Sequence, residues 1–360
     1  MQDFVYTGLA MRVVFGSGTM ARLPEEVKGL GRSRALVLST PPQAAQAEAL
    51  AASLGDLAVG TFTAAAMHTP TDVTARAVAK AREVGADCTV AVGGGSTTGL
   101  GKAIALATDL DQIVVPTTYA GSEMTPILGQ TEGGLKTTQR SPKILPEVVL
   151  YDVDLTLTLP AGLTATSGMN AIAHAVEALY AQDRNPIVSL MAEEGIAALA
   201  RALPRLVAAA DDREARSDAL YGAWLCGLCL GSVGMALHHK LCHTLGGSFD
   251  LPHAETHTVV LPYATAYNAP AAPDAMARIA RALGSTDAAT GLWDLAGRLG
   301  APRSLHALGL PESALDRAAD LATANPYWNP RPIERDAIRS LLAQAWAGDV
   351  PRGAEPCAAA

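Results

Sequence analysis

The sequence predicts an α/β N-terminal domain over residues 1–155 and an all-α C-terminal domain over residues 156–360. The first domain is expected to be Rossmann-like, with a doubly wound and mostly parallel sheet. Two observations lead to this prediction. The chain has 360 residues, about twice a typical domain. Strand and helix patterns alternate in the first part, whereas after Leu155 nearly every apolar pattern is helical.

Each N-terminal element follows from a short apolar run and the turn residues that bound it. Continuous apolar runs are typical of strands that are buried on both faces of a parallel sheet. Ala-rich segments bounded by Gly, and a segment led by Thr71 and Asp72, have the pattern of helices. We expect strands at 12–16, 35–39, 57–62, 88–92 and 112–115, and helices at 43–54, at 71–84 and continuing through 101–108.

The C-terminal domain shows almost no strand pattern. Clusters of Pro or Gly separate most of its helical segments. We expect helices at 164–181, 186–203, 211–230, 235–246, 274–283, 290–299, 312–324 and 334–347.

Composition excludes several classes of protein. Hydrophobic residues make up 49% of the chain and charged residues 17%, which excludes a disordered chain. The formal charge is -8 and no block of Lys or Arg occurs, so neither a nucleic-acid nor a membrane partner is expected. The five cysteines are an odd number, which argues for a reducing cytoplasm. Cys226 and Cys229 lie in an apolar run, so we expect buried helix residues rather than a redox pair.

A glycine loop stands between a predicted strand and a predicted helix. Gly93, Gly94 and Gly95 would let backbone N–H groups approach a phosphate at the positive end of the helix, and Ser96 adds a hydroxyl. The loop matches neither the GxGxxG fingerprint nor a P-loop. Because it follows a strand in a βαβ pattern, we interpret it as a phosphate-binding loop.

Two further segments leave the carboxyl ends of strands, where open sheets bind ligands. The loop after the strand at 112–115 contributes candidate cofactor contacts from Thr117, Thr118, Tyr119 and Ser122. Ser39 ends the second strand, where many dinucleotide sites carry a carboxylate that repels a 2′-phosphate. Because Ser39 is neutral, the sequence admits both nicotinamide nucleotides.

Five of the eight histidines lie between residues 238 and 257. His239 and His243 are spaced i, i+4 on one helix face, and Asn170 and His174 repeat that spacing on another helix. His253 follows Pro252 in a predicted loop. Two helices and a loop are thus expected to bring polar groups together, as a metal site or as a pocket for an anionic substrate with a proton donor. The set Asn170, His174, His239 and His253 contains no carboxylate, which argues against a tightly held metal.

On these residues the chain resembles the iron-containing (group III) alcohol dehydrogenase family over nearly its whole length. The motifs that carry the resemblance are Phe15-Gly16-Ser17-Gly18, residues 93–96, residues 116–122, Asn170 to His174, His239-xxx-His243 and Pro252-His253. Within the family it is most similar to the maleylacetate reductase branch, on residues 93–102, 251–257 and 325–332.

The resemblance implies a dehydroquinate synthase-like architecture and a homodimer. The family usually binds its metal with one Asp and three His, and the Asp position is Asn170 here, while His174, His239 and His253 match. The family's usual Asp after the glycine loop is Gly99 here, as in the maleylacetate reductase branch. We therefore expect no metal.

The resemblance also implies NADH- or NADPH-dependent reduction of maleylacetate, a small dicarboxylate, to 3-oxoadipate. We expect His243 and His253 to be catalytic, and His68, Asn170, His174, His239 and Lys143 to contact substrate. Other candidate partners of the carboxylates are Lys136, Arg140, Lys240 and Arg331. Three alternatives are a metal-dependent alcohol dehydrogenase, a lyase that uses NAD transiently and a non-catalytic NAD-binding module.

Overall fold

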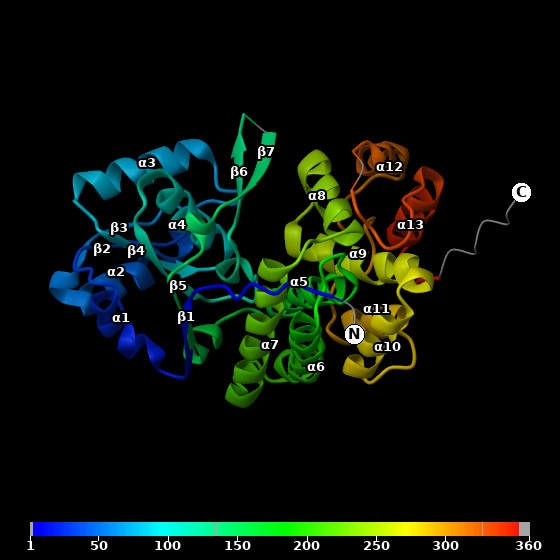
Figure 1. Ribbon diagram of the computed structural model, residues 1–360, viewed down its shortest axis with the longest axis horizontal. Coiled ribbons are helices and arrows are strands. Elements are labelled where there is room, and N and C mark those ends of the chain that lie inside the picture. The colour runs from blue at the N-terminus through cyan, green and yellow to red at the C-terminus, as the bar shows by residue number, and fades with distance from the viewer. Residues whose placement is uncertain (1–2, 134, 326, 353–360) are drawn as a thin grey trace, which may run out of the picture. The chain divides into compact units, whose positions relative to one another are not determined.

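The computed structural model describes residues 3–133, 135–325 and 327–352, with only the backbone of Leu135 and Lys136 (Figure 1). The chain divides into two compact units, Gly8–Leu159 and Met1–Thr7 with Pro160–Ala360. The division falls after Leu159 rather than after residue 155, and the first few residues belong with the C-terminal unit. Each unit is described by itself below.

The N-terminal unit contains a six-stranded parallel sheet with the order β1-β8-β5-β4-β2-β3. Its strands are β1 (Arg12–Gly16), β2 (Ala35–Leu38), β3 (Ala58–Phe62), β4 (Cys88–Gly93), β5 (Asp111–Pro116) and β8 (Val148–Asp152). From β2 the chain moves to one edge through β3 and then returns to place β4 on the other side of β2. The strand order therefore reverses between β2 and β4, which is where open α/β sheets bind ligands.

Helices cover both faces of this sheet, as expected for a doubly wound fold. One face packs Val37, Val90 and Ile113 against α1 (Leu23–Gly29) and α2 (Ala44–Leu54). α3 (Thr71–Glu83) packs on α4 (Gly95–Thr108), which contacts β4 and β5 from the other face (Figure 1). The predicted doubly wound fold, and the helices predicted at 43–54, 71–84 and 101–108, are thus confirmed.

Several elements between residues 20 and 160 were not predicted. They are helix α1, strand β8 and an antiparallel hairpin of β6 (Ile127–Glu132) and β7 (Leu135–Arg140). β8 is an apolar run, Val148-Val149-Leu150-Tyr151, that lies buried between β1 and β5, so its pattern was present in the sequence. The hairpin is polar and half-exposed and lacks such a pattern.

The C-terminal unit is helical in its described residues. Its helices are α5 (Ala161–Tyr180), α6 (Pro186–Ala208), α7 (Arg213–Ser232), α8 (Leu237–Phe249), α9 (His253–Asn268), α10 (Pro273–Leu283), α11 (Ala288–Arg298), α12 (Leu315–Thr323) and α13 (Arg335–Ala347). α5 is the central helix, buried along most of its length and packed by α6, α7 and α9. Small residues allow this approach: at Gly168, a Cβ would lie 2.6 Å from a methyl carbon of Leu203.

α9 corrects the prediction at His253. The sequence placed His253 in a loop, but it is the first residue of α9, with Pro252 as the N-cap. Pro is favoured at the start of a helix because the N–H it lacks has no intrahelical partner there. The histidine cluster is therefore built from three helices rather than from two helices and a loop.

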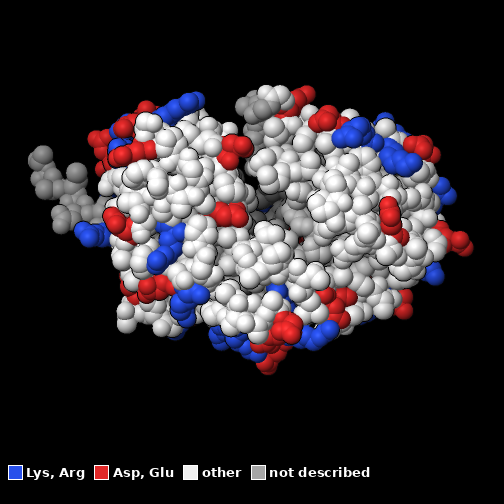
Figure 2. Space-filling view, turned by 180° about the vertical axis from the view of Figure 1, so that it is seen from behind, with Lys and Arg blue, Asp and Glu red and all other residues white. Residues whose placement is uncertain are grey.

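Helix hydropathy, surface charge and the cysteines can be compared with what the composition predicts. No single helix among the described residues is long and apolar enough to cross a membrane, although α7 and α8, bent by 94°, together pass the length and hydropathy test. Figure 2 shows acidic and basic side chains interspersed over one face. Cys88, Cys226, Cys229 and Cys242 are buried free thiols, and burial raises the pKa of each.

Candidate functional site

The glycine loop joins β4 to α4. Gly93 ends β4 with a φ of 150°, Gly94 is the N-cap, and Gly95 begins the helix. A Cβ on Gly93 would lie 2.5 Å from Thr97 Oγ1 and 2.8 Å from Gln43 Oε1. Gly93 is therefore required by close side chains and by its backbone angle. The first turn of α4, which includes Ser96, presents backbone N–H groups at the carboxyl end of the sheet.

The second predicted cofactor loop lies directly beside the glycine loop. Thr117 N donates to Gly93 O at 2.9 Å, and a Cβ on Gly94 would lie 3.1 Å from Thr118 Oγ1. Gln43 Nε2 donates to Thr117 Oγ1 at 3.3 Å. The structure thus brings Gly93–Ser96, Thr117 and Thr118 together where the strand order reverses.

The remaining predicted cofactor residues lie around this centre. Ser39 directly follows β2 and is fully buried, and its hydroxyl donates to Thr40 O at 3.2 Å. Tyr119 is fully buried farther along the second loop. Ser122 begins a short 3-10 helix, and its carbonyl accepts a hydrogen bond from Lys102 Nζ.

Lys102 lies in the 93–102 motif, but the sequence predicted no role for it. It lies on α4 with its side chain fully buried, and Nζ also donates to Thr125 Oγ1 and Ile127 O, each at 2.9 Å. Burial lowers the pKa of Lys102 to about 7, although Glu123 opposes the shift. Burial raises the pKa of Glu123, which accepts from Tyr151 Oη at 2.9 Å. Lys102 therefore ties the second loop to the helix of the glycine loop.

His68 lies in a turn after β3 that has two consecutive left-handed residues. The φ angles are 61° at His68 and 46° at Thr69, which is costly for a β-branched residue. A Cβ on Gly99 would lie 2.4 Å from Thr69 Oγ1. The glycine at position 99 therefore makes room for this turn beside α4, which a carboxylate side chain would not do.

The histidine cluster brings together side chains from α5, α8 and α9. The ring centroids of His174 and His239 are 5.2 Å apart, and those of His239 and His243 are 6.2 Å apart. The ring centroids of His253 and His257 are 4.3 Å apart. The i, i+4 spacings on α5 and α8 therefore place Asn170, His174, His239 and His243 in one region of the unit.

This cluster has a buried side and an exposed side. Asn170, His174 and His239 are buried, whereas His243 and His253 are exposed. Burial, followed by the neighbouring imidazoles, lowers the pKa of His174 well below its usual value. Asn170 Oδ1, His174 Nδ1 and His239 Nε2 are buried and have no hydrogen-bond partner within the described part of the chain. Such atoms are costly unless an occupant pairs with them.

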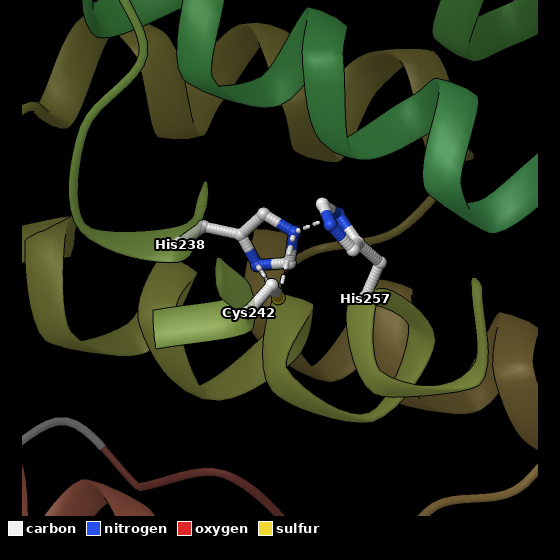
Figure 3. Close-up of side chains that lie close together, drawn as sticks. All are labelled: His238, Cys242 and His257. Atoms are coloured by element: carbon white, nitrogen blue, oxygen red, sulfur yellow. Dashed lines mark hydrogen bonds between the residues drawn. The ribbon is translucent and has the colours of Figure 1, made fainter. Parts of the chain in front are cut away.

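A second layer of residues supports the cluster, and the sequence analysis did not assign it a role. His238 Nε2 and His257 Nδ1 are hydrogen-bonded at 3.0 Å, with Cys242 Sγ 3.7 Å from His238 Nε2 and 4.0 Å from its Nδ1 (Figure 3). Ligand atoms of these three residues lie within 4.8 Å of one another. The sulfur is nearly equidistant from both ring nitrogens, so it lies beside the ring rather than on a nitrogen lone pair. We interpret the group as a hydrogen-bonded pair packed by a thiol.

The candidate basic residues have partners of their own. Lys143 Nζ forms an exposed ion pair with Asp109 Oδ1 at 2.6 Å. The guanidinium of Arg331 donates to Tyr267 O at 3.1 Å and stacks on the Tyr267 ring. Lys240 Nζ lies 5.6 Å from the centroid of the Tyr327 ring. The side chain of Lys136 is outside the described part of the chain. Substrate contact by Lys143 stays a prediction.

Comparison with known proteins agrees with this arrangement. The model of iron-containing alcohol dehydrogenases matches residues 10–153, and the C-terminal model of that family matches residues 164–346. A maleylacetate reductase from Rhizobium sp. (strain MTP-10005) is 64% identical over 98% of this chain and 100% of its own. One from Sphingobium indicum is 60% identical over 97% and 99%. The crystal structure of maleylacetate reductase from Agrobacterium tumefaciens is 63% identical, with a TM-score of 0.95 over 98% of this chain and 100% of that chain. The chain therefore belongs to the iron-containing alcohol dehydrogenase family, in its maleylacetate reductase branch.

Proposed function

We propose that this chain reduces maleylacetate to 3-oxoadipate with NADH or NADPH. The observation that carries the proposal is the 64% identity to a maleylacetate reductase across nearly the whole of both chains. The same comparison favours this activity over an alcohol dehydrogenase, a lyase or a non-catalytic module.

The N-terminal unit supports the nucleotide part of the proposal. Its glycine loop and the Thr117–Thr118 segment adjoin at the point where the strand order reverses. No carboxylate follows β2, since Ser39, Thr40 and two prolines occupy that turn. A 2′-phosphate would thus meet no like charge there, so we expect both nucleotides to serve.

The C-terminal unit supports the chemistry on the substrate. Maleylacetate has an alkene conjugated to a ketone, and a nicotinamide nucleotide held at the glycine loop would supply the hydride for the alkene carbon β to that ketone. Negative charge then develops on the ketone oxygen, where imidazole donors stabilise an enolate. One proton added to the neighbouring carbon completes the reduction. His243, with His253 in the same cluster, is the proposed donor, and both are exposed and able to recover a proton from water.

We further propose that the reaction needs no metal, although the family is named for iron. Asn170 stands where the family has a carboxylate ligand, so the ligand set is neutral, and a neutral set binds a divalent ion weakly. The donor set of Asn170, His174, His239 and His253 would leave the charge of a divalent ion uncompensated, so the proposed mechanism assigns every role to protein side chains.

The experiment follows absorbance of NADH, and separately of NADPH, with maleylacetate in the presence and absence of a strong chelator. We expect oxidation that the chelator does not change, with no stoichiometric metal by elemental analysis. Activity that needs added iron or zinc would contradict the metal-free proposal. Failure to oxidise either nucleotide would contradict the reductase itself.

A variant pair tests the role of His243. His243→Ala is expected to lower turnover by about 10²–10⁴-fold, the usual contribution of a general acid, while NADH affinity is retained. His306→Ala is the matched control, because His306 packs on Trp346 with centroids 5.0 Å apart and is not part of the cluster. Unchanged turnover in His243→Ala would refute its assignment as the proton donor.

We also propose a homodimer and a cytoplasmic location. Light scattering after size-exclusion chromatography would check the oligomeric state.

A further inference from the structure

Glu177 is a buried carboxylate on α5 that the sequence motifs did not single out. Its side chain is fully buried, one helical turn after His174. Four nitrogen atoms of the segment that begins α8 lie at hydrogen-bond distance from it. They are Ala236 N at 3.0 Å, His238 N at 2.8 Å, His239 N at 3.4 Å and His239 Nδ1 at 2.6 Å.

Three of these contacts cap α8. The N-cap residue is Ala236, which has no side chain able to accept a hydrogen bond, and the first N–H groups of a helix need acceptors. Glu177 supplies them from a neighbouring helix, with its charge at the positive end of α8. The backbone N–H groups of Ala236, His238 and His239 can only donate, and the two carboxylate oxygens accept from all three.

The fourth contact fixes the ring of His239. A neutral imidazole carries one proton, and a carboxylate at 2.6 Å from Nδ1 retains that proton on Nδ1. Nε2 then has a lone pair, and it is the buried atom that lacks a partner in the described part of the chain. The same carboxylate thus holds the helix and the ring together.

We propose that Glu177 is a positioning residue for the active site. It holds the His239 proton on Nδ1 and presents Nε2 to the substrate, and it couples this orientation to the start of α8. The part concerning substrate rests on the reductase proposed above, whereas the protonation of the ring does not.

The decisive measurement is the ¹⁵N spectrum of the His239 ring in the folded protein at about pH 8, above the usual imidazole range. Wild-type protein is expected to show a protonated Nδ1 and an unprotonated Nε2. In Glu177→Leu, Nδ1 loses its acceptor, so the proton should move to Nε2. Glu177→Gln can keep its amide oxygen where Oε2 accepts from Ala236 N, His239 N and His239 Nδ1, so it should leave the proton on Nδ1. Glu177→Asp retains the charge and should retain the wild-type protonation.

Two spectroscopic results would overturn the proposal. One is a wild-type ring with the proton on Nε2, and the other is a folded Glu177→Leu variant whose ring is unchanged. Neither depends on maleylacetate, so the reductase function and the role of Glu177 can fail separately.

Kinetics supply the second readout. Glu177→Leu should lower kcat/KM about tenfold or more, as loss of an orienting partner of a functional histidine does, and Glu177→Asp should recover part of it. Asp287→Ala is the control, because Asp287 caps α11 through Thr290 N at 2.7 Å and touches none of the cluster. If Asp287→Ala lowers kcat/KM as much as Glu177→Leu at an equal loss of stability, Glu177 is only a helix cap and the proposal fails.

Discussion

Replacement of Lys102 by Met tests how a buried charge supports the cofactor loop. The side chain is fully buried and Nζ donates to Ser122 O, Thr125 Oγ1 and Ile127 O. Met has a similar length without the donors, so Ile127 O loses its hydrogen bond from Nζ at a cost of about 1–3 kcal/mol, whereas Ser122 O keeps its hydrogen bonds from Thr125 N and Thr125 Oγ1. Removal of the buried ammonium offsets this cost, because burial lowers the Lys102 pKa from 10.5 to about 7, a penalty of about 5 kcal/mol when the group is charged.

The lost hydrogen bond and the penalty for burying the ammonium depend differently on pH, so measurements at several pH values separate the two. Below pH 7, Lys102 is protonated in both the folded and the unfolded chain, so the full penalty destabilises the wild type. Between pH 7 and 10.5 the unfolded chain holds a proton that the folded chain has released, so wild-type stability rises with pH. The hydrogen bond to Ile127 O that Lys102→Met removes contributes equally at every pH.

The assay is urea unfolding of the wild type and Lys102→Met at pH 7, 8 and 9. The free energy of unfolding of the wild type relative to the variant should rise by about 2–3 kcal/mol across this range. Lys80→Met, on the surface of α3, is the control and should show no such rise. A constant difference between wild type and Lys102→Met would refute the reasoning, since Lys102 would then be charged in the folded protein throughout.

Two further predictions concern packing and thiol chemistry. Gly168→Ala should lower the free energy of unfolding by about 1–3 kcal/mol, because its Cβ would lie 2.6 Å from Leu203 Cδ2. In the control Gly162→Ala, the Cβ meets nothing within 4 Å, so the change should be neutral or stabilising. Equal thermal unfolding midpoints for the two variants would contradict the α5–α6 contact. Cys226 and Cys229 are fully buried with raised pKa values, so neither thiol should react with a disulfide reagent until the protein unfolds, and rapid labelling of the folded protein would contradict their burial.

The sequence determined the elements that have a strong local pattern. Apolar runs predicted β2, β4 and β5, and glycines at the end of β4 predicted the loop that begins α4. The i, i+4 spacing predicted that Asn170 and His174 share a face of α5, and that His239 and His243 share a face of α8. These features depend on residues close in the chain, so periodicity and turn chemistry suffice to find them.

Only the tertiary structure decided which distant groups meet. Glu177 and His239 are 62 residues apart, and no local pattern joins a mid-helix carboxylate to the start of another helix. The same holds for Lys102 with the loop at Ser122, and for Gly99, whose missing side chain makes room for Thr69. Burial removes these polar groups from water, and each must find its partner among whatever the fold places beside it; the identity of that partner is a property of the packing and not of the local sequence.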